Sequence, residues 1–136
     1  METDKTGESE DLSYFIGLDW FEESGRSFAV IARHCLCPQC KERLVSEPEA
    51  MTPASLVANV RDCCCNVPGF IDLRLPLLEK VFRLILSEGN RPLSLTELTA
   101  RLSPYSDNPV SLSPATLKRL LDNSKHYGFR VRLGED

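Results

Sequence analysis

Six cysteines stand in two tight groups, and no other cysteine occurs in the 136 residues of the chain. The first group is Cys35, Cys37 and Cys40, and the second is the consecutive run at positions 63–65. The 22 residues between Cys40 and the run are enough for a turn and one helix, which can bring the second group back to the first. Two such groups can share one metal ion. We expect zinc, which prefers four thiolate or imidazole ligands in a tetrahedron.

The spacing inside the two groups indicates which cysteines bind. Cys37 and Cys40 are separated by two residues, the spacing of a loop whose backbone amides turn toward both thiolates. Two of the three consecutive cysteines should complete the site, because neighbouring side chains point about 100° apart in a helix and to opposite faces in a strand. We expect this second pair to include Cys65, either as Cys63 with Cys65 or as Cys64 with Cys65.

Other interpretations of the cysteines are open at this point. Cys35 or His34 would serve as a substitute ligand if only one member of the run binds. Free cysteines also pack in protein interiors as small hydrophobic residues, so buried reduced thiols are an alternative to a metal. An iron–sulfur cluster or a redox-active dithiol is a third interpretation. A site closed by four protein ligands leaves no position for substrate or an activated water, so it would be structural rather than enzymatic.

Composition and charge indicate where the chain works and what it can touch. No apolar run approaches the roughly 18 residues of a membrane span, and the acidic start lacks the basic and apolar stretches of a secretory signal. We therefore expect a cytoplasmic protein with reduced thiols. Residues 1–50 hold five Lys and Arg against eleven Asp and Glu, whereas residues 76–136 hold nine against seven. Any contact with phosphates should thus involve the second half.

The first 70 residues are expected to form a tail and a small helical unit. Residues 1–12 are polar and acidic, which is typical of a disordered tail. Residues 13–70 should form a zinc-stapled unit, since so small a fold rarely buries enough apolar surface to be stable alone. Three helices are predicted there: a short one capped by Asp19, one that follows the cap Ser27, and one over 51–62 capped by Thr52.

The remaining residues, 71–136, are expected to form a second unit of three helices and one strand. Pro68 and Gly69 mark the boundary between the two units. The predicted helices run from Pro76 to Gly89, from the cap Ser94 or Thr96 to Leu102, and from Pro114 to Ser124. The strict alternation of apolar and basic residues over 129–133 predicts a half-buried strand.

The order helix, short strand, helix, loop, helix and strand over residues 76–133 resembles the winged-helix superfamily. The resemblance implies that the third helix enters the major groove of DNA while the first two brace it. The outward polar residues of that helix and its end would then contact DNA: Thr116, Lys118, Arg119, Asn123 and Lys125. A typical wing is a two-stranded hairpin, but only one strand follows the third helix, so residues 93–95 are its expected partner.

These observations predict a mainly α fold, with an N-terminal zinc-stapled helical unit and a C-terminal winged-helix-like unit that carries a minimal β element. The expected function is transcription-related, through direct contact with duplex DNA or with a DNA-bound complex. The first alternative is a protein-interaction adaptor whose partner binds the aromatic residues Tyr14, Phe15, Trp20 and Phe21, and a more distant one is a thiol redox sensor. The sequence has no glycine-rich phosphate loop and no glycine-flanked serine nucleophile, which argues against an enzyme.

Overall fold

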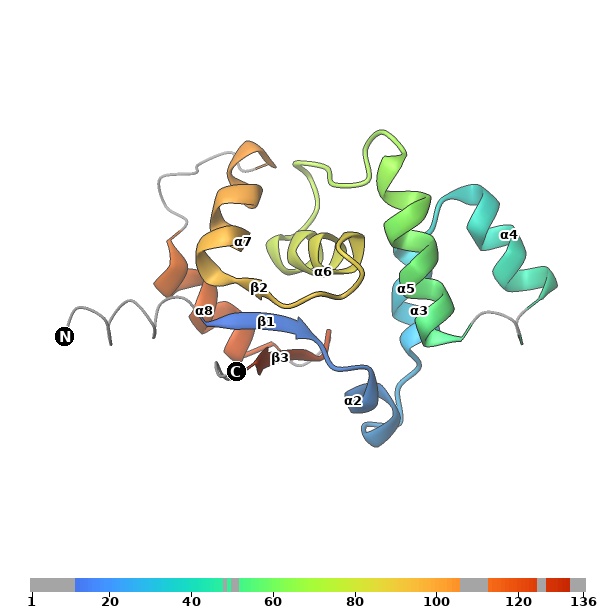
Figure 1. The fold of residues 1–136 in the computed structure, drawn as a ribbon, viewed down its shortest axis with the longest axis horizontal. Coiled ribbons are helices and arrows are strands. Elements are labelled where there is room, and N and C mark those ends of the chain that lie inside the picture. The colour runs from blue at the N-terminus through green and yellow to red at the C-terminus, as the bar shows by residue number, and fades with distance from the viewer. Residues whose placement is uncertain (1–11, 48, 50–51, 106–112, 125–126, 133–136) are drawn as a thin grey trace.

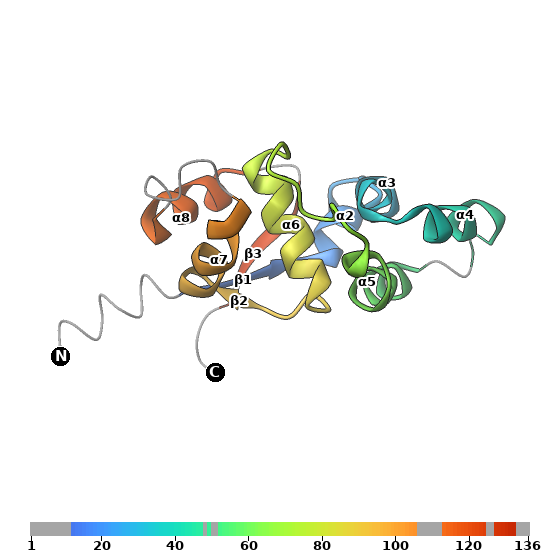
Figure 2. The ribbon, with the colours of Figure 1, turned by 90° about the horizontal axis from the view of Figure 1, so that it is seen from above.

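The computed structural model describes residues 12–47, 49, 52–105, 113–124 and 127–132. The protein is mainly helical with a small three-stranded antiparallel sheet, which confirms the expected fold class. The sheet, α7 and α8 lie toward one end of the molecule, α3, α4 and α5 lie toward the other, and α6 lies between them (Figures 1 and 2). None of the helices in the described residues is long and apolar enough to cross a membrane.

The sheet joins strands that are far apart in the sequence. Its order is β2-β1-β3, with β1 over Ser13–Ile16, β2 over Leu93–Ser94 and β3 over Phe129–Arg132. Tyr14 and Ile16 of β1 alternate with more exposed neighbours and are each only 1% exposed, so one face of the strand belongs to the core. The expected pairing of the last strand with residues 93–95 is therefore wrong, because β1 lies between them and pairs with both.

The start of the chain also differs from the prediction. Residues 13–16 form a strand that was not predicted, and the short helix expected to start at the cap Asp19 is α2 over Leu18–Glu23. The residue before α2 is Gly17, and Asp19 lies in the first turn instead of capping it. The extended backbone places the alternate residues Tyr14 and Ile16 on the buried face of the sheet.

A single asparagine fastens β1 to the turn after α6 (Leu77–Ser87). Asn90 has a φ of 63°, a left-handed conformation that asparagine tolerates better than most residues. Its Oδ1 accepts a hydrogen bond from the Ile16 backbone N–H at 2.8 Å, and its Nδ2 donates to the Ile16 carbonyl at 2.9 Å. The side-chain amide thus satisfies both backbone groups of Ile16.

The three predicted helices of the second half are present, and local signals explain their bounds. α6 begins after Pro76, α7 spans Leu95–Leu102, and α8 spans Pro114–Asp122. Ser94 accepts from the Glu97 backbone N–H to cap α7, and Ser113 caps α8 from the position before Pro114. A 3₁₀ turn over Ser103–Tyr105 follows α7.

The helices of the first half lead the chain through both cysteine groups. α3 spans Phe28–Ala32 and is capped by Ser27 as predicted, and it continues into the 3₁₀ turn η1 over Arg33–Cys35. α4 (Pro38–Ser46) starts at the proline, and α5 (Pro53–Asp62) is capped by Thr52 as predicted. The 3₁₀ turn η3 over Cys64–Asn66 ends α5.

One cluster of buried side chains runs through both halves of the chain. Phe82 and Ile85 of α6 belong to it together with Phe21 of α2 and Leu56 of α5. The middle strand of the sheet comes from residues assigned to the first predicted unit, while both outer strands come from the second. The unit boundary near residue 70 stays a prediction, and residues 1–11 of the predicted tail lie outside the described residues.

Candidate metal centre

The two cysteine groups meet in space. The sulfur atoms of Cys37, Cys40 and Cys63 all lie within 4.8 Å of one another, and those of Cys37 and Cys63 are 3.7 Å apart. Cys64 joins them, since its sulfur accepts a hydrogen bond from the Cys37 backbone N–H at 3.2 Å. Four thiolates about 2.3 Å from one tetrahedral ion lie about 3.8 Å from each other. These cysteines could therefore hold a metal ion.

The ends of two helices bring these sulfurs together. Cys37 is the residue before α4, and Cys40 follows in its first turn because Pro38 starts the helix without needing a backbone N–H. Cys63 closes α5 with a φ of −130° and a ψ of −62°, which departs from helical geometry. The chain then tightens into η3 at Cys64. This break between a helix and a 3₁₀ turn turns two adjacent side chains toward one point.

Hydrogen bonds at the cluster favour one thiolate before any cation is considered. Burial disfavours ionisation of Cys37, but hydrogen bonds from the Cys40 backbone N–H and the neighbouring thiols outweigh it and lower the pKa of Cys37 to about 7. Burial raises the pKa of Cys40 and of Cys64 instead, and the nearby Cys37 charge adds to the effect. Metal ligation requires thiolates, so a bound cation would supply the positive charge that ionises the remaining sulfurs.

The other predicted ligands lie elsewhere. Cys65 points back along the chain and donates from its sulfur to the Arg61 carbonyl at 3.0 Å, so the two pairs that include Cys65 are not the pair that the structure brings together. Cys35 is 4% exposed, and burial raises the pKa of its thiol to about 12. His34 is exposed and, like Cys35, lines a separate pocket.

An arginine that the sequence analysis did not single out holds both cysteine-bearing segments. The Arg83 guanidinium of α6 donates from Nη2 to the His34 carbonyl and from Nη1 to the Phe70 carbonyl, both at 2.8 Å. It also pairs with Glu79 at 2.7 Å, and its charged group lies 5.6 Å from the centre of the Phe70 ring. His34 precedes the first ligand by three positions, and Phe70 follows the second group. Only the i, i+4 spacing of Glu79 and Arg83 signalled this contact in the sequence.

The residues predicted to contact DNA lie on or beside α8, and several of them already make hydrogen bonds or ion pairs within that helix. Thr116 shares hydrogen bonds with the cap Ser113, and Lys118 pairs with Asp122 at 2.8 Å. Asn123 donates to the Arg119 carbonyl at 2.9 Å, while the Arg119 side chain is exposed. Lys125 lies outside the described residues.

The aromatic residues proposed for a protein partner divide into two kinds. Tyr14 and Phe21 are each 1% exposed and are core residues. Tyr14 also donates from its hydroxyl to Asp122 of α8 at 2.8 Å, which ties the first strand to that helix. Phe15 and Trp20 are half-buried. Only these two retain surface that a partner could touch.

Cys37, Cys40, Cys63 and Cys64 together form a sulfur cage that could hold a metal ion. Within the described residues, this is the one group of three or more histidine, cysteine or acidic side chains with ligand atoms close enough to share an ion. No protein-family model matches the chain, and neither the curated proteins nor the solved structures include a significant match. The geometry of the site therefore carries the functional argument.

Proposed function

We propose that Cys37, Cys40, Cys63 and Cys64 bind one Zn²⁺ ion as a structural site. The convergence of their sulfurs is the observation that carries the proposal, because the 3.7 Å separation of Cys37 and Cys63 matches the edge of a tetrahedral thiolate site. An iron–sulfur cluster places several iron and sulfide atoms between its cysteines, which requires a wider cage. Four thiolates select zinc over magnesium or calcium, which prefer oxygen ligands.

Zinc at this position would fasten the start of α4 to the end of α5. Val57 and Val60 of α5 belong to the core, whereas the described residues of α4 contribute only Cys40 to its fully buried set. Apolar packing alone therefore does little to hold α4 against the rest of the fold. A structural zinc site contributes its binding free energy directly to folding, and this is the contribution that α4 lacks.

Metal analysis of the purified protein tests the site, with Cys40→Ala and Cys65→Ala as a matched pair. We expect one zinc per chain in the wild type, loss of stoichiometric zinc in Cys40→Ala, and retention in Cys65→Ala because the Cys65 sulfur faces the Arg61 carbonyl. Bound iron together with visible absorption and acid-labile sulfide would show that the cysteines hold an iron–sulfur cluster instead of zinc. A stable wild type with six titratable thiols and no metal would refute the site altogether.

We further propose that the protein is transcription-related and contacts duplex DNA, or a complex bound to it, through α8. The order α6, β2, α7, α8 and β3 supports this proposal, since it follows the order of elements in winged-helix domains. Exposed basic side chains also support it: Arg119 lies on α8, and Arg130 and Arg132 lie on the adjacent strand β3. Such side chains can neutralise phosphates.

The dependence of duplex binding on salt tests this role. Arg119→Ala is the cleanest variant, because Lys118 already pairs with Asp122 and its removal would also disturb α8. We expect the slope of log affinity against log salt to become shallower by about 0.9 for one lost phosphate contact. Arg74→Ala is the matched control, since that arginine is 90% exposed and lies on the loop before α6. Binding that is absent at low ionic strength, or equally affected by both changes, excludes direct DNA contact.

The competing role is a protein-interaction adaptor without nucleic-acid contact. One observation favours it: Leu120, beside Arg119 on α8, is 37% exposed, and an exposed leucine suits a protein surface better than a phosphate backbone. The half-buried Phe15 and Trp20 could extend such an interface. A defined partner complex that survives high salt and is weakened by Leu120→Ser would support the adaptor over the DNA-binding role.

A further inference from the structure

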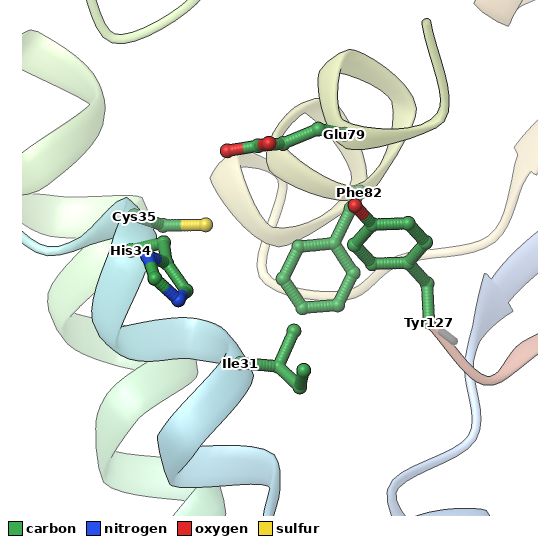
Figure 3. Close-up of a pocket in the computed structure, with 6 residues that line it drawn as sticks. All are labelled: Ile31, His34, Cys35, Glu79, Phe82 and Tyr127. Carbon is green, nitrogen blue, oxygen red and sulfur yellow. The ribbon is translucent and has the colours of Figure 1, made fainter. Parts of the chain in front are cut away.

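A cavity of about 310 Å³ lies between α3, η1, α6 and Tyr127, apart from the sulfur cage. Its walls are Ile31, His34, Cys35, Glu79, Phe82 and Tyr127, and Figure 3 shows these side chains gathered around one space. Phe82 and Cys35 are buried at its floor, whereas His34 is exposed at its mouth. The Phe82 and Tyr127 rings are 5.2 Å apart and tilted by 45°, so they form an aromatic side.

The size and walls of the cavity define what fits. An apolar cavity of about 150 Å³ in another protein takes up benzene, so about twice that volume accommodates a two-ring aromatic molecule. It also lies at the lower end of the usual range for ligand pockets. Ile31, Phe82 and Tyr127 offer apolar and aromatic contact to such rings.

The polar side of the cavity selects for an uncharged ligand with a hydrogen-bond donor. The Glu79 charge is already balanced by Arg83, whose two hydrogen bonds to this carboxylate both end on Oε2. Its second oxygen, Oε1, keeps lone pairs for a donor on the ligand. None of the described residues that line the cavity is a lysine or arginine, and the Glu79 carboxylate would repel a carboxylate or phosphate on the ligand.

We propose that this cavity binds a small, uncharged, two-ring aromatic molecule whose N–H or O–H group donates to Glu79. The Cys35 thiol is only 4% exposed, so it serves as part of the cavity floor. The proposal goes beyond the zinc and DNA roles and depends on neither. It also gives a role, as walls of the cavity, to Glu79, His34 and Cys35, three residues that are not part of the sulfur cage.

The position of the cavity couples it to the metal centre. Glu79 holds Arg83, and Arg83 in turn holds the carbonyls of His34 and Phe70 on the two cysteine-bearing segments. A ligand that donates to Glu79 therefore touches the same ion pair that positions both halves of the sulfur cage. Ligand binding should consequently slow the release of the metal.

Indole and 1-methylindole are the probes that test the proposal on the full chain as purified. Both have two rings, but only indole has an N–H donor. We expect saturable binding of indole by calorimetry and about tenfold weaker binding of 1-methylindole, because a hydrogen bond to a carboxylate is lost. Equal affinities for the two probes, or no saturable binding of either, would overturn the proposal.

A matched pair of variants on α3 locates the site. Ile31→Trp fills the cavity and should reduce indole affinity by at least about tenfold, whereas Val30→Trp places the same side chain at a neighbouring position that is 61% exposed and should leave it unchanged. Undiminished binding in Ile31→Trp would also overturn the proposal. If that variant fails to fold, the ratio between indole and 1-methylindole on the wild type decides the outcome.

Discussion

Replacing Arg83 tests how the two cysteine-bearing segments are held to the rest of the fold. The Arg83 side chain is 12% exposed and its partner Glu79 is 21% exposed, so this ion pair is well shielded from water. Arg83→Met keeps much of the apolar length of the side chain and removes its charge and all of its donors. The change therefore isolates the polar contacts from the packing of the stem.

The structure sets the expected size of the effect. Two carbonyl hydrogen bonds, to His34 and Phe70, are lost at about 1 kcal/mol each. The Glu79 carboxylate is left without its partner, and breaking a shielded pair on one side costs about 3 to 5 kcal/mol when the burial is complete. Because Glu79 retains some exposure, we expect a total loss of about 3 kcal/mol in the free energy of unfolding. Arg74→Met, which removes an ion pair with a 90% exposed arginine, should have little effect on stability because water screens that pair.

Urea unfolding of the metal-saturated protein measures both variants. Trp20 is the only tryptophan and packs against Phe21 with ring centres 4.9 Å apart, so its fluorescence reports loss of the core. Adding Glu79→Gln to Arg83→Met should recover part of the loss, since no charge is then left unpaired. The reasoning is refuted if Arg83→Met costs under about 1 kcal/mol, or no more than Arg74→Met. Transfer of the metal to a chelator should also be faster in Arg83→Met.

Two further predictions concern the sheet and the pH dependence of stability. Asn90→Ala should lower the free energy of unfolding in urea by about 2 to 3 kcal/mol, and Asn90→Gly should lower it by about 1 to 2 kcal/mol. Both variants lose the hydrogen bonds to β1, but only alanine is strained at a φ of 63°. Equal losses would contradict a role for the backbone conformation. A hydrogen bond from Arg101 lowers the pKa of Glu88 below its ordinary 4.5, so Glu88 stabilises the fold above that pH and the contribution disappears as pH falls through the lowered pKa. Glu88→Gln should accordingly cost about 1 kcal/mol at pH 7 and almost nothing in strong acid, and a cost independent of pH would argue against the ion pair.

Local signals predicted most of the helices, although α4 (Pro38–Ser46) was not among the predicted ones. Ser27, Thr52, Ser94 and Ser113 each accept a backbone hydrogen bond three residues ahead, and the helices begin directly after them. Caps of this kind depend on neighbours in the sequence and need no knowledge of the fold. The mainly helical fold class could therefore be predicted from the sequence.

The sheet was harder to predict because its pairing is non-local. Ser13 lies opposite both Ser94 and Arg132, partners that are about 80 and 120 positions away in the chain. The four residues of β1 carry only two inward side chains, too few for a decisive alternation. Asn90, which holds the end of β1, lies in a turn where the sequence indicates only that the helix stops.

The cysteine pairing shows which physical assumption failed. The expectation that the second pair would include Cys65 assumed continuous regular structure through residues 63–65, in which neighbouring side chains diverge. The chain instead changes from α-helix to 3₁₀ turn between Cys63 and Cys64, and their sulfurs converge while that of Cys65 returns to the Arg61 carbonyl. A helix end is thus a place where adjacent cysteines can act as a pair. The spacing of ligands in a sequence must be judged against where its helices stop, and here α5 ends at Asp62, directly before the two adjacent cysteines whose sulfurs converge.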